Sequence, residues 1–127
     1  VLNESLATAE PDDLGNDNYF KRDGVRNKTL RQLQRGQLSI ENEIDLHGMT
    51  VKEAAAHLKD FIAHCYQHQQ RCVRVIHGKG LSSGPDGPKL KPMTAQYLRR
   101  WDEVLAYCSA RPNDGGSGAL YVLLRKS

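Results

Sequence analysis

Two short stretches of the chain carry the side chains with the clearest chemical potential. Asp45 and His47 close one apolar run, and His77 with Lys79 closes another thirty residues later. Side chains alternate along a strand, so Asp45 and His47 share one face, where the carboxylate can orient and polarise the imidazole. His77 can supply a partner acid or base, while Lys79 and glycine amides can hold a phosphate. Together these groups would meet the needs of phosphodiester cleavage.

Each of these residues also has a plain structural interpretation. Asp-x-His is a common pattern, His77 can cap its strand through a backbone hydrogen bond, and the glycines can simply serve turns. Metal use stays open: Asp45 and His47 could ligate a divalent ion such as Mg²⁺ or Mn²⁺, or RNA could be cut without metal through its 2′-hydroxyl. His64 and His68 have the spacing of zinc ligands but no evident third ligand, so we interpret them as solvated helix-edge residues.

The pattern around the two stretches predicts a βαβ unit. Residues 43–46 alternate polar and apolar like a strand, and residues 50–53 form a capping box. Apolar positions three and four apart then continue a helix to about residue 69, and the β-branched run 71–77 is typical of a buried parallel strand. A right-handed crossover makes the strands parallel, so both histidines fall at one edge, where such sheets bind ligands.

The remainder of the chain predicts a second helix and two further strands. Residues 78–88 form a long glycine-rich loop, and a helix follows over 90–101 with a proline in its first turn. Strands are expected at 104–109 and 119–124, joined by the turn 111–118. This turn is too short for a helical crossover, so the last strand runs antiparallel. The turn then lies on the same edge as the two histidines.

Charge separates a tail from the rest of the chain. The length of 127 residues fits one domain plus a tail, and residues 1–20 hold five acids with no Lys or Arg, which predicts a disordered acidic tail. The other 107 residues hold 18 basic and 10 acidic side chains, a formal charge of +8. A basic body suggests an anionic partner such as nucleic acid, and the alternative is ordinary solubilising charge.

Residues 21–41 form a basic extension ahead of the domain at 42–127. A short helix is predicted over 28–34, with Asn27 as its cap and Gly36 as its stop. The helix could grip phosphates as a basic arm, or it could dock on the domain through its two leucines. We favour docking as its role in the fold, with its charges adding affinity for an anion.

Cysteine use and hydropathy exclude several classes of protein. Cys65, Cys72 and Cys108 are odd in number, lie among apolar neighbours and lack a CxxC spacing, which favours core thiols in a reducing cytoplasm. No apolar run approaches the length of a membrane span. The first ten residues lack the basic and apolar regions of a secretory signal, so we expect a cytoplasmic protein.

Three motifs in order resemble the Smr (small MutS-related) domain. They are Asp45-Leu46-His47-Gly48, then His77-Gly78-Lys79-Gly80, then Gly115-Gly116-Ser117-Gly118 ahead of a β-rich run. The resemblance covers roughly residues 42–126. The basic segment before it is similar to the extension of short stand-alone bacterial Smr proteins.

This resemblance implies a fold and an activity. The fold is an α/β (α+β) two-layer sandwich with βαβαββ order, a four-stranded mixed sheet in the order 1-2-4-3, strand four antiparallel, and two helices packed on the sheet. The family also implies nucleic-acid binding and endonuclease activity. DNA nicking is attributed to some members, and cleavage of messenger RNA on stalled or collided ribosomes to others.

We therefore predict a monomeric endonuclease that acts on DNA or RNA, with the ribosome as a possible partner and no membrane. The predicted catalytic residues are Asp45, His47 and His77. The predicted phosphate or nucleic-acid contacts are Lys79, Gly78, Gly80, Arg74, Arg111 and Gly116, with Arg99 and Arg100 as further candidates. The alternatives are a module that binds nucleic acid or a ribosome without cutting it, and an interaction domain for a protein partner.

Overall fold

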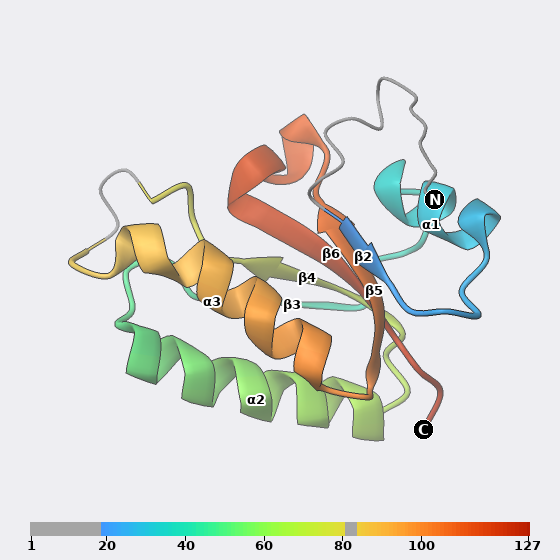
Figure 1. Ribbon diagram of the computed structural model, residues 1–127, viewed down its shortest axis with the longest axis horizontal. Coiled ribbons are helices and arrows are strands. Elements are labelled where there is room, and N and C mark those ends of the chain that lie inside the picture. Colours follow the sequence, from blue (N-terminus) through green and yellow to red (C-terminus); the bar gives the residue numbers. More distant parts are fainter. Residues whose placement is uncertain (1–18, 81–83) are drawn as a thin grey trace.

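The computed structural model describes residues 19–80 and 84–127, which form a sheet with helices on both faces (Figure 1). The strands are β2 (Tyr19–Lys21), β3 (Asn42–Asp45), β4 (Cys72–Ile76), β5 (Val104–Ser109) and β6 (Ala119–Leu124). The helices are α1 (Asn27–Gln34), α2 (Val51–Gln67) and α3 (Gly87–Arg100). Two short 3₁₀ turns, η2 (Pro112–Asp114) and η3 (Gly116–Gly118), join β5 to β6.

The sheet has the predicted topology with one strand added. Its order is β2-β5-β6-β4-β3, so the four predicted strands lie in the order 1-2-4-3. β3 pairs parallel with β4, while β6 runs antiparallel to both β4 and β5, as predicted.

The fifth strand corrects the predicted four-stranded sheet. β2 pairs antiparallel with β5 and extends that edge of the sheet. Tyr19 and Phe20, which the sequence assigned to the disordered tail, belong to it, and residues 1–18 of that tail lie outside the described residues. A strand of three residues is too short to give a readable alternation, and only its pairing with β5 defines it.

Helix α2 begins with the predicted capping box. Thr50 Oγ1 accepts from the Glu53 N–H at 3.1 Å, and the Thr50 N–H donates to Glu53 Oε1 at 3.0 Å. This exchange satisfies two donors at a helix start that would otherwise have no partner. The helix ends at Gln67, two residues before the expected end.

The other two helices begin earlier than predicted. α1 starts at Asn27 itself, and Arg26 occupies the cap position without a side-chain bond, so Asn27 is not the cap. α3 starts at Gly87 because Pro88, with its fixed φ, suits the first turn. Pro92 therefore lies inside α3, and not in its first turn as predicted.

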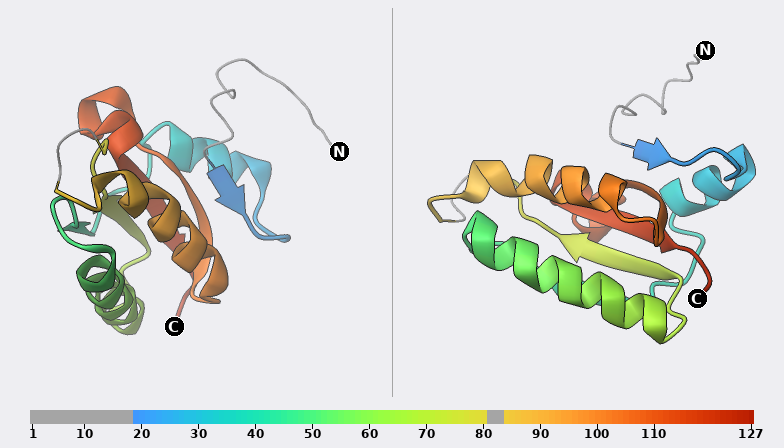
Figure 2. Two further views of the ribbon diagram at one scale, coloured as in Figure 1. Left: turned by 60° about the vertical axis from the view of Figure 1, so that its left-hand side comes forward. Right: turned by 60° about the horizontal axis from the view of Figure 1, so that its bottom comes forward.

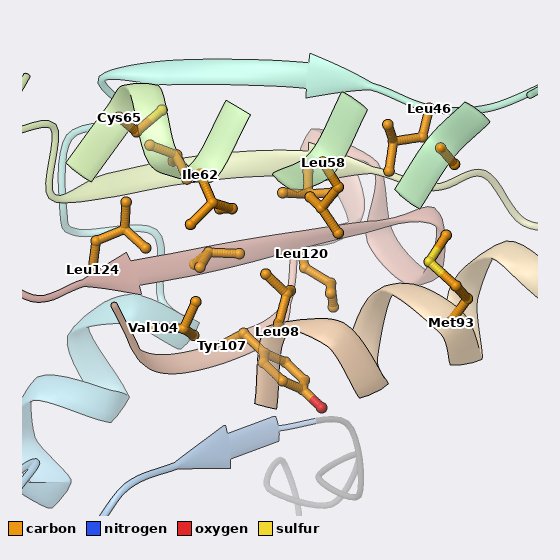
Figure 3. Packing of buried hydrophobic residues seen from close by; sticks show 14 of the residues in the cluster. Leu46, Leu58, Ile62, Cys65, Met93, Leu98, Val104, Tyr107, Leu120 and Leu124 are labelled. Atoms are coloured by element: carbon orange, nitrogen blue, oxygen red, sulfur yellow. The ribbon is translucent and has the colours of Figure 1, made fainter. Parts of the chain in front are cut away.

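The main core lies between the sheet and helices α2 and α3. Figure 3 shows Leu58 and Ile62 of α2 and Leu98 of α3 pointing toward Leu120 and Val104 of the sheet. Burying an aliphatic side chain of this size stabilises the fold by about 1.5–3 kcal/mol. No helix among the described residues combines the length and apolarity needed to cross a membrane.

All three cysteines are free and buried, as predicted. Burial raises the pKa of the Cys65 and Cys72 thiols to about 11 and that of Cys108 to about 12. The protonated thiol is a poor nucleophile and a poor metal ligand, so these cysteines act as small core residues.

The opposite face of the sheet is covered in part by α1 (Figure 2). Leu30 and Leu33 are 7% and 1% exposed, which confirms that α1 docks through its leucines. Leu33 packs in a second cluster with residues such as Ala106 and Tyr121. The basic extension is therefore part of the folded molecule.

Arg22 links the N-terminal extension to the end of the sheet where β5 begins. Its Nε donates to the Val104 carbonyl at 2.7 Å, and its Nη2 donates to the carbonyls of Arg99 and Trp101 at 2.8 and 3.0 Å. A cation at this position also suits the negative end of α3. One side chain thus joins β2, β5 and the last turn of α3.

Candidate active site

The loops after β3, β4 and β5 meet at one edge of the sheet. The Leu46 N–H donates to the Ile76 carbonyl at 2.7 Å, which holds the ends of β3 and β4 together. The Gly118 carbonyl accepts from the N–H groups of both His77 and Gly78, each at 3.0 Å. The glycine-rich turn before β6 therefore lies directly against the His77 loop, and the predicted convergence is confirmed.

Asp45 and His47 form the central pair of this edge. His47 Nδ1 lies 2.6 Å from Asp45 Oδ1, and the His47 backbone N–H donates to the same oxygen at 3.0 Å. An ionised carboxylate can only accept, so Nδ1 carries a proton and Nε2 is left for a substrate. Both side chains are about half exposed, at 60% for His47 and 49% for Asp45. A polymer could reach this pair without any opening of the fold.

The pair lies on the face of the sheet that α1 covers in part. Ile44 and Leu46 pack in the core under α2, and alternation along the strand turns Asp45 and His47 the other way. The hydrophobic partners of this short strand therefore determine which face presents the pair.

His77 has a different environment. It is fully buried, its Nδ1–H donates to the Gly78 carbonyl at 2.7 Å, and its Nε2 has no partner among the described residues. Burial lowers the pKa of this imidazole, and the nearby Lys91 charge lowers it further against the opposing effect of the Gly78 bond. His77 thus lies beneath the loop as a neutral ring, while His47 lies on its surface.

Close glycine packing positions Lys79. A Cβ on Gly118 would lie 3.1 Å from Lys79 Cγ, so the stem of Lys79 passes directly over Gly118. Gly80 has a φ of +84° and packs against the backbone of Pro88 at the start of α3. Lys79 itself is exposed at this rim, where its charge is available to an anion.

Asp86 joins the loop before α3 to the start of α2, a role that the sequence did not reveal. Its Oδ2 accepts from the Val51 N–H at 2.9 Å, while α3, the helix that it precedes, receives no side-chain cap. A Cβ on Gly84 would lie 3.2 Å from the Gly48 carbonyl oxygen, so this segment packs on the loop after His47. An acid just before Gly87 resembles a cap for α3, and only the fold shows that it caps α2.

Two predicted phosphate-binding arginines make contacts within the chain, Arg74 through all three guanidinium nitrogens and Arg111 through one. Arg74 donates to Glu43 Oε1 and, at 3.0 Å, to the Asp114 carbonyl. Arg111 donates to the Arg35 carbonyl at 3.3 Å. The contact between Arg74 and Glu43 could have been predicted from the sequence, because the parallel pairing of β3 and β4 places Glu43 beside Arg74.

The remaining predicted contacts divide between the two ends of the sheet. Gly116 lies in η3 at the candidate site, with open space where a Cβ would stand. Arg99 and Arg100 end α3, and this end of the helix lies at the opposite end of the sheet from the end of β3 (Figure 1). Lys91, which sequence reasoning missed, is near enough to His77 to affect its pKa and adds positive charge to the candidate site.

The described residues offer little for a protein-bound metal. Within residues 19–80 and 84–127, no three His, Cys, Asp or Glu side chains gather as a metal site. His64 and His68 stack on one another with ring centroids 4.1 Å apart. Asp45 keeps one oxygen that His47 does not contact, which fits an ion held mainly by substrate phosphates and water.

Comparison with known proteins places this geometry in a family. The Smr domain model matches residues 44–125, and the chain belongs to this family. It is similar to the crystal structure of YdaL, a stand-alone small MutS-related protein from Escherichia coli, with a TM-score of 0.74 and 34% identity over 85% of this chain and 82% of that one. The Smr domain of Thermus thermophilus MutS2 matches with a TM-score of 0.59 and 31% identity, covering 66% and 98% of the two chains.

Two groups of relatives carry different names. A "Probable DNA endonuclease SmrA" of Escherichia coli (strain K12) is 34% identical over 108 residues, which is 85% of this chain and 58% of the relative. A "Ribosome rescue factor SmrB" of Vibrio vulnificus (strain CMCP6) is 36% identical over 105 residues, or 83% and 56%. The chain spans a little over half the length of these curated relatives.

Proposed function

We propose that this protein binds nucleic acid and cleaves phosphodiester bonds in DNA or RNA. The observation that carries the proposal is the 2.6 Å contact between His47 Nδ1 and Asp45 Oδ1 on an exposed loop edge. The relatives named as an endonuclease and as ribosome rescue factors support the class of substrate. We propose a cytoplasmic monomer, consistent with its free cysteines.

In this proposal His47 is the acid–base residue. Asp45 holds the ring with Nδ1 protonated, so Nε2 accepts a proton from the attacking hydroxyl, which is either a ribose 2′-hydroxyl or water. The phosphorus–oxygen bond to the leaving oxygen then breaks, and the imidazolium returns a proton to that oxygen. The leaving oxygen is the 5′-oxygen when the 2′-hydroxyl attacks, and the 3′-oxygen when water attacks and leaves a 5′-phosphate. The Asp45 carboxylate stabilises the imidazolium between the two transfers.

Lys79 and the loop amides would stabilise the charge that develops on the phosphate. Lys79 is exposed beside the glycine turn, and Lys91 adds a second positive charge to the same edge. Fixed positive charge of this kind favours the transition state over the ground state. His77 has a positioning role in this scheme, because its buried ring holds the turn that carries Lys79.

A divalent ion such as Mg²⁺ or Mn²⁺ fits the proposal only in part. Asp45 would be its ligand, and such an ion would supply an activated water and neutralise phosphate charge. The proton transfers assigned to His47 do not require it.

A second candidate function is a module that binds nucleic acid or a ribosome without cutting it. The burial of His77 favours this alternative, because it leaves His47 as the exposed imidazole of the two histidine motifs. The binding module predicts salt-dependent affinity, no products at any concentration of divalent metal, and unchanged affinity when Asp45 and His47 are replaced.

Cleavage of end-labelled single- and double-stranded DNA and RNA by His47→Ala and Asp45→Asn tests the proposal. We expect His47→Ala to lower the rate by about 10²- to 10⁴-fold, the usual contribution of one acid–base group, and Asp45→Asn to give a smaller loss. His57→Ala is the matched control, because His57 is an exposed histidine on α2. Undiminished cleavage by the Asp45/His47 double alanine variant would disprove the assignment.

The chemical ends of the product distinguish the two nucleophiles. A 2′,3′-cyclic phosphate identifies RNA as the substrate and the 2′-hydroxyl as the nucleophile. A 5′-phosphate identifies activated water, which usually requires a metal ion.

A further inference from the structure

An arginine-lined depression lies at the end of the sheet opposite His47. Its volume is about 530 Å³, and its polar lining comes from Arg22, Asp23, Arg26, Thr29, Arg71 and Arg125. These residues come from the β2–α1 connection, the first turn of α1, the start of β4 and the end of β6. Four arginines and one aspartate thus line a space large enough for a phosphate group and its neighbouring sugars.

Backbone contacts hold two of these arginines while leaving much of their donor capacity. Arg71 Nε donates to the Leu124 carbonyl at 2.7 Å, and Arg125 Nε donates to the Asp102 carbonyl at 2.9 Å. The terminal nitrogens of both have no hydrogen-bond partner in the described part of the chain. Each guanidinium is therefore oriented by one nitrogen and can present the others as a fork, the geometry that suits phosphate.

Within the described residues, no ion pair neutralises the arginines that line the depression. Across the described ranges, none of the four arginines forms an ion pair with an acid, and neither does Asp23. The first turn of α1 adds partial positive charge from the same side, because its cap residue Arg26 makes no side-chain bond and the turn holds no acid.

The depression and the Asp45–His47 pair open on the same face of the sheet. Leu105 and Leu123 line the depression and belong to the cluster that α1 covers, and this is the face toward which Asp45 and His47 turn. β4 and β6 separate the two places by five or six residues, about 17 Å at 3.3 Å per residue. That distance corresponds to about five base steps of a duplex strand.

We propose that this depression binds a backbone phosphate of the nucleic acid whose cleavage we assign to Asp45 and His47. The inference rests on the proposed function for its ligand, since nucleic acid is the anion that could reach both ends of the sheet at once. The depression would fix the register of the strand across the face without reading its bases, as phosphate contacts do.

The test measures oligonucleotide binding as a function of salt in a His47→Ala background, so that no substrate is cut. The double variant Arg26→Gln/Arg125→Gln removes two exposed guanidinium groups that line the depression. Arg31→Gln/Lys59→Gln is the matched control, because it removes the same charge from exposed positions that do not line it. Circular dichroism and thermal unfolding confirm that both variants fold.

With a 16-nucleotide single strand, we expect the Arg26/Arg125 variant to lower the slope of log K against log salt by about 0.7, the value for one phosphate contact, and to weaken binding about fourfold at physiological salt. The control should change the slope by less than about 0.3. A four-nucleotide strand is too short to reach both the depression and the Asp45–His47 pair. With this strand, the difference in slope between the Arg26/Arg125 variant and the protein with both arginines should therefore fall by at least half.

Equal slopes for the two double variants would overturn the proposal. Tighter binding of polyglutamate, an anionic polymer without phosphates, than of the 16-nucleotide strand would also overturn it. Cleavage is scored separately with His47 intact. Cleavage with no difference in slope rejects the depression and leaves the proposed function standing. A slope difference without cleavage by the wild type supports the depression and rejects the nuclease.

Discussion

His77 is the fully buried histidine of the candidate site, and burial lowers the pKa of its imidazole. In the unfolded chain this ring binds a proton below about pH 6.5, whereas in the folded chain it stays neutral to a lower pH. Unfolding therefore takes up a proton in this window, and the free energy of unfolding falls as the pH falls, by up to about 1.4 kcal/mol per pH unit. Urea unfolding at pH 7.5, 6.5 and 5.5 measures this slope.

Replacement of His77 by Asn isolates its share of the pH dependence. The Asn side-chain amide can keep the bond to the Gly78 carbonyl but cannot titrate, so we expect a flatter pH profile. His57→Asn is the control, because His57 is exposed and its loss should leave the wild-type profile in place. Identical pH slopes for His77→Asn and the wild type would show that His77 is not the titrating group.

At the scale of the elements, Asp86 couples the starts of two helices. Removal of its carboxylate by Asp86→Ala frees the Val51 N–H in the first turn of α2 and should cost about 1 kcal/mol, the usual value for a lost cap. The same change should lower any cleavage rate, because residues 84–86 pack on the loop after His47. Denaturant unfolding and initial rates measure the two effects.

Asp60→Ala provides the comparison, since Asp60 is an exposed acid on α2 with no hydrogen bond or ion pair within the described residues. It should change stability by no more than about 0.5 kcal/mol. A similar loss for both variants would mean that Asp86 acts only as surface charge.

Elements with strong local signals could be predicted from the sequence. The capping box located the start of α2, and β5 and β6 begin and end at the predicted residues because β-branched and aromatic runs stop at turn residues. β2 could not be predicted, because its three residues become a strand only through pairing with β5. The early start of α3 was missed because Pro92 suggested a first turn that Pro88 in fact occupies.

The candidate site was predictable where its geometry follows the backbone. The alternation of β3 places Asp45 and His47 together, and the βαβ crossover brings His77 to the same edge. The burial of His77 and the occupation of Arg74 by Glu43 depend on tertiary packing, which local pattern does not encode. Residue types therefore revealed what could do chemistry, and the fold determines which of them are accessible.

At the scale of the whole molecule, both faces of the sheet require cover. α2 and α3 cover one face, and α1 of the extension covers part of the other, while β2 extends the sheet at its edge (Figure 2). The extension also supplies Arg22, which satisfies three carbonyls at the far end of the sheet. It is thus both a structural layer and one wall of the arginine-lined depression.

Leu33→Ala tests the contribution of this layer. Leu33 is 1% exposed in the cluster under α1, so its truncation should lower the free energy of unfolding by about 2–5 kcal/mol. Ile40→Ala, at a position 39% exposed, is the aliphatic control and should cost much less. If α1 is an independent arm, the two variants will unfold at the same denaturant concentration. If it is part of the fold, only Leu33→Ala will shift the midpoint, and a chain that begins at Asn42 will shift it further because it also lacks Arg22.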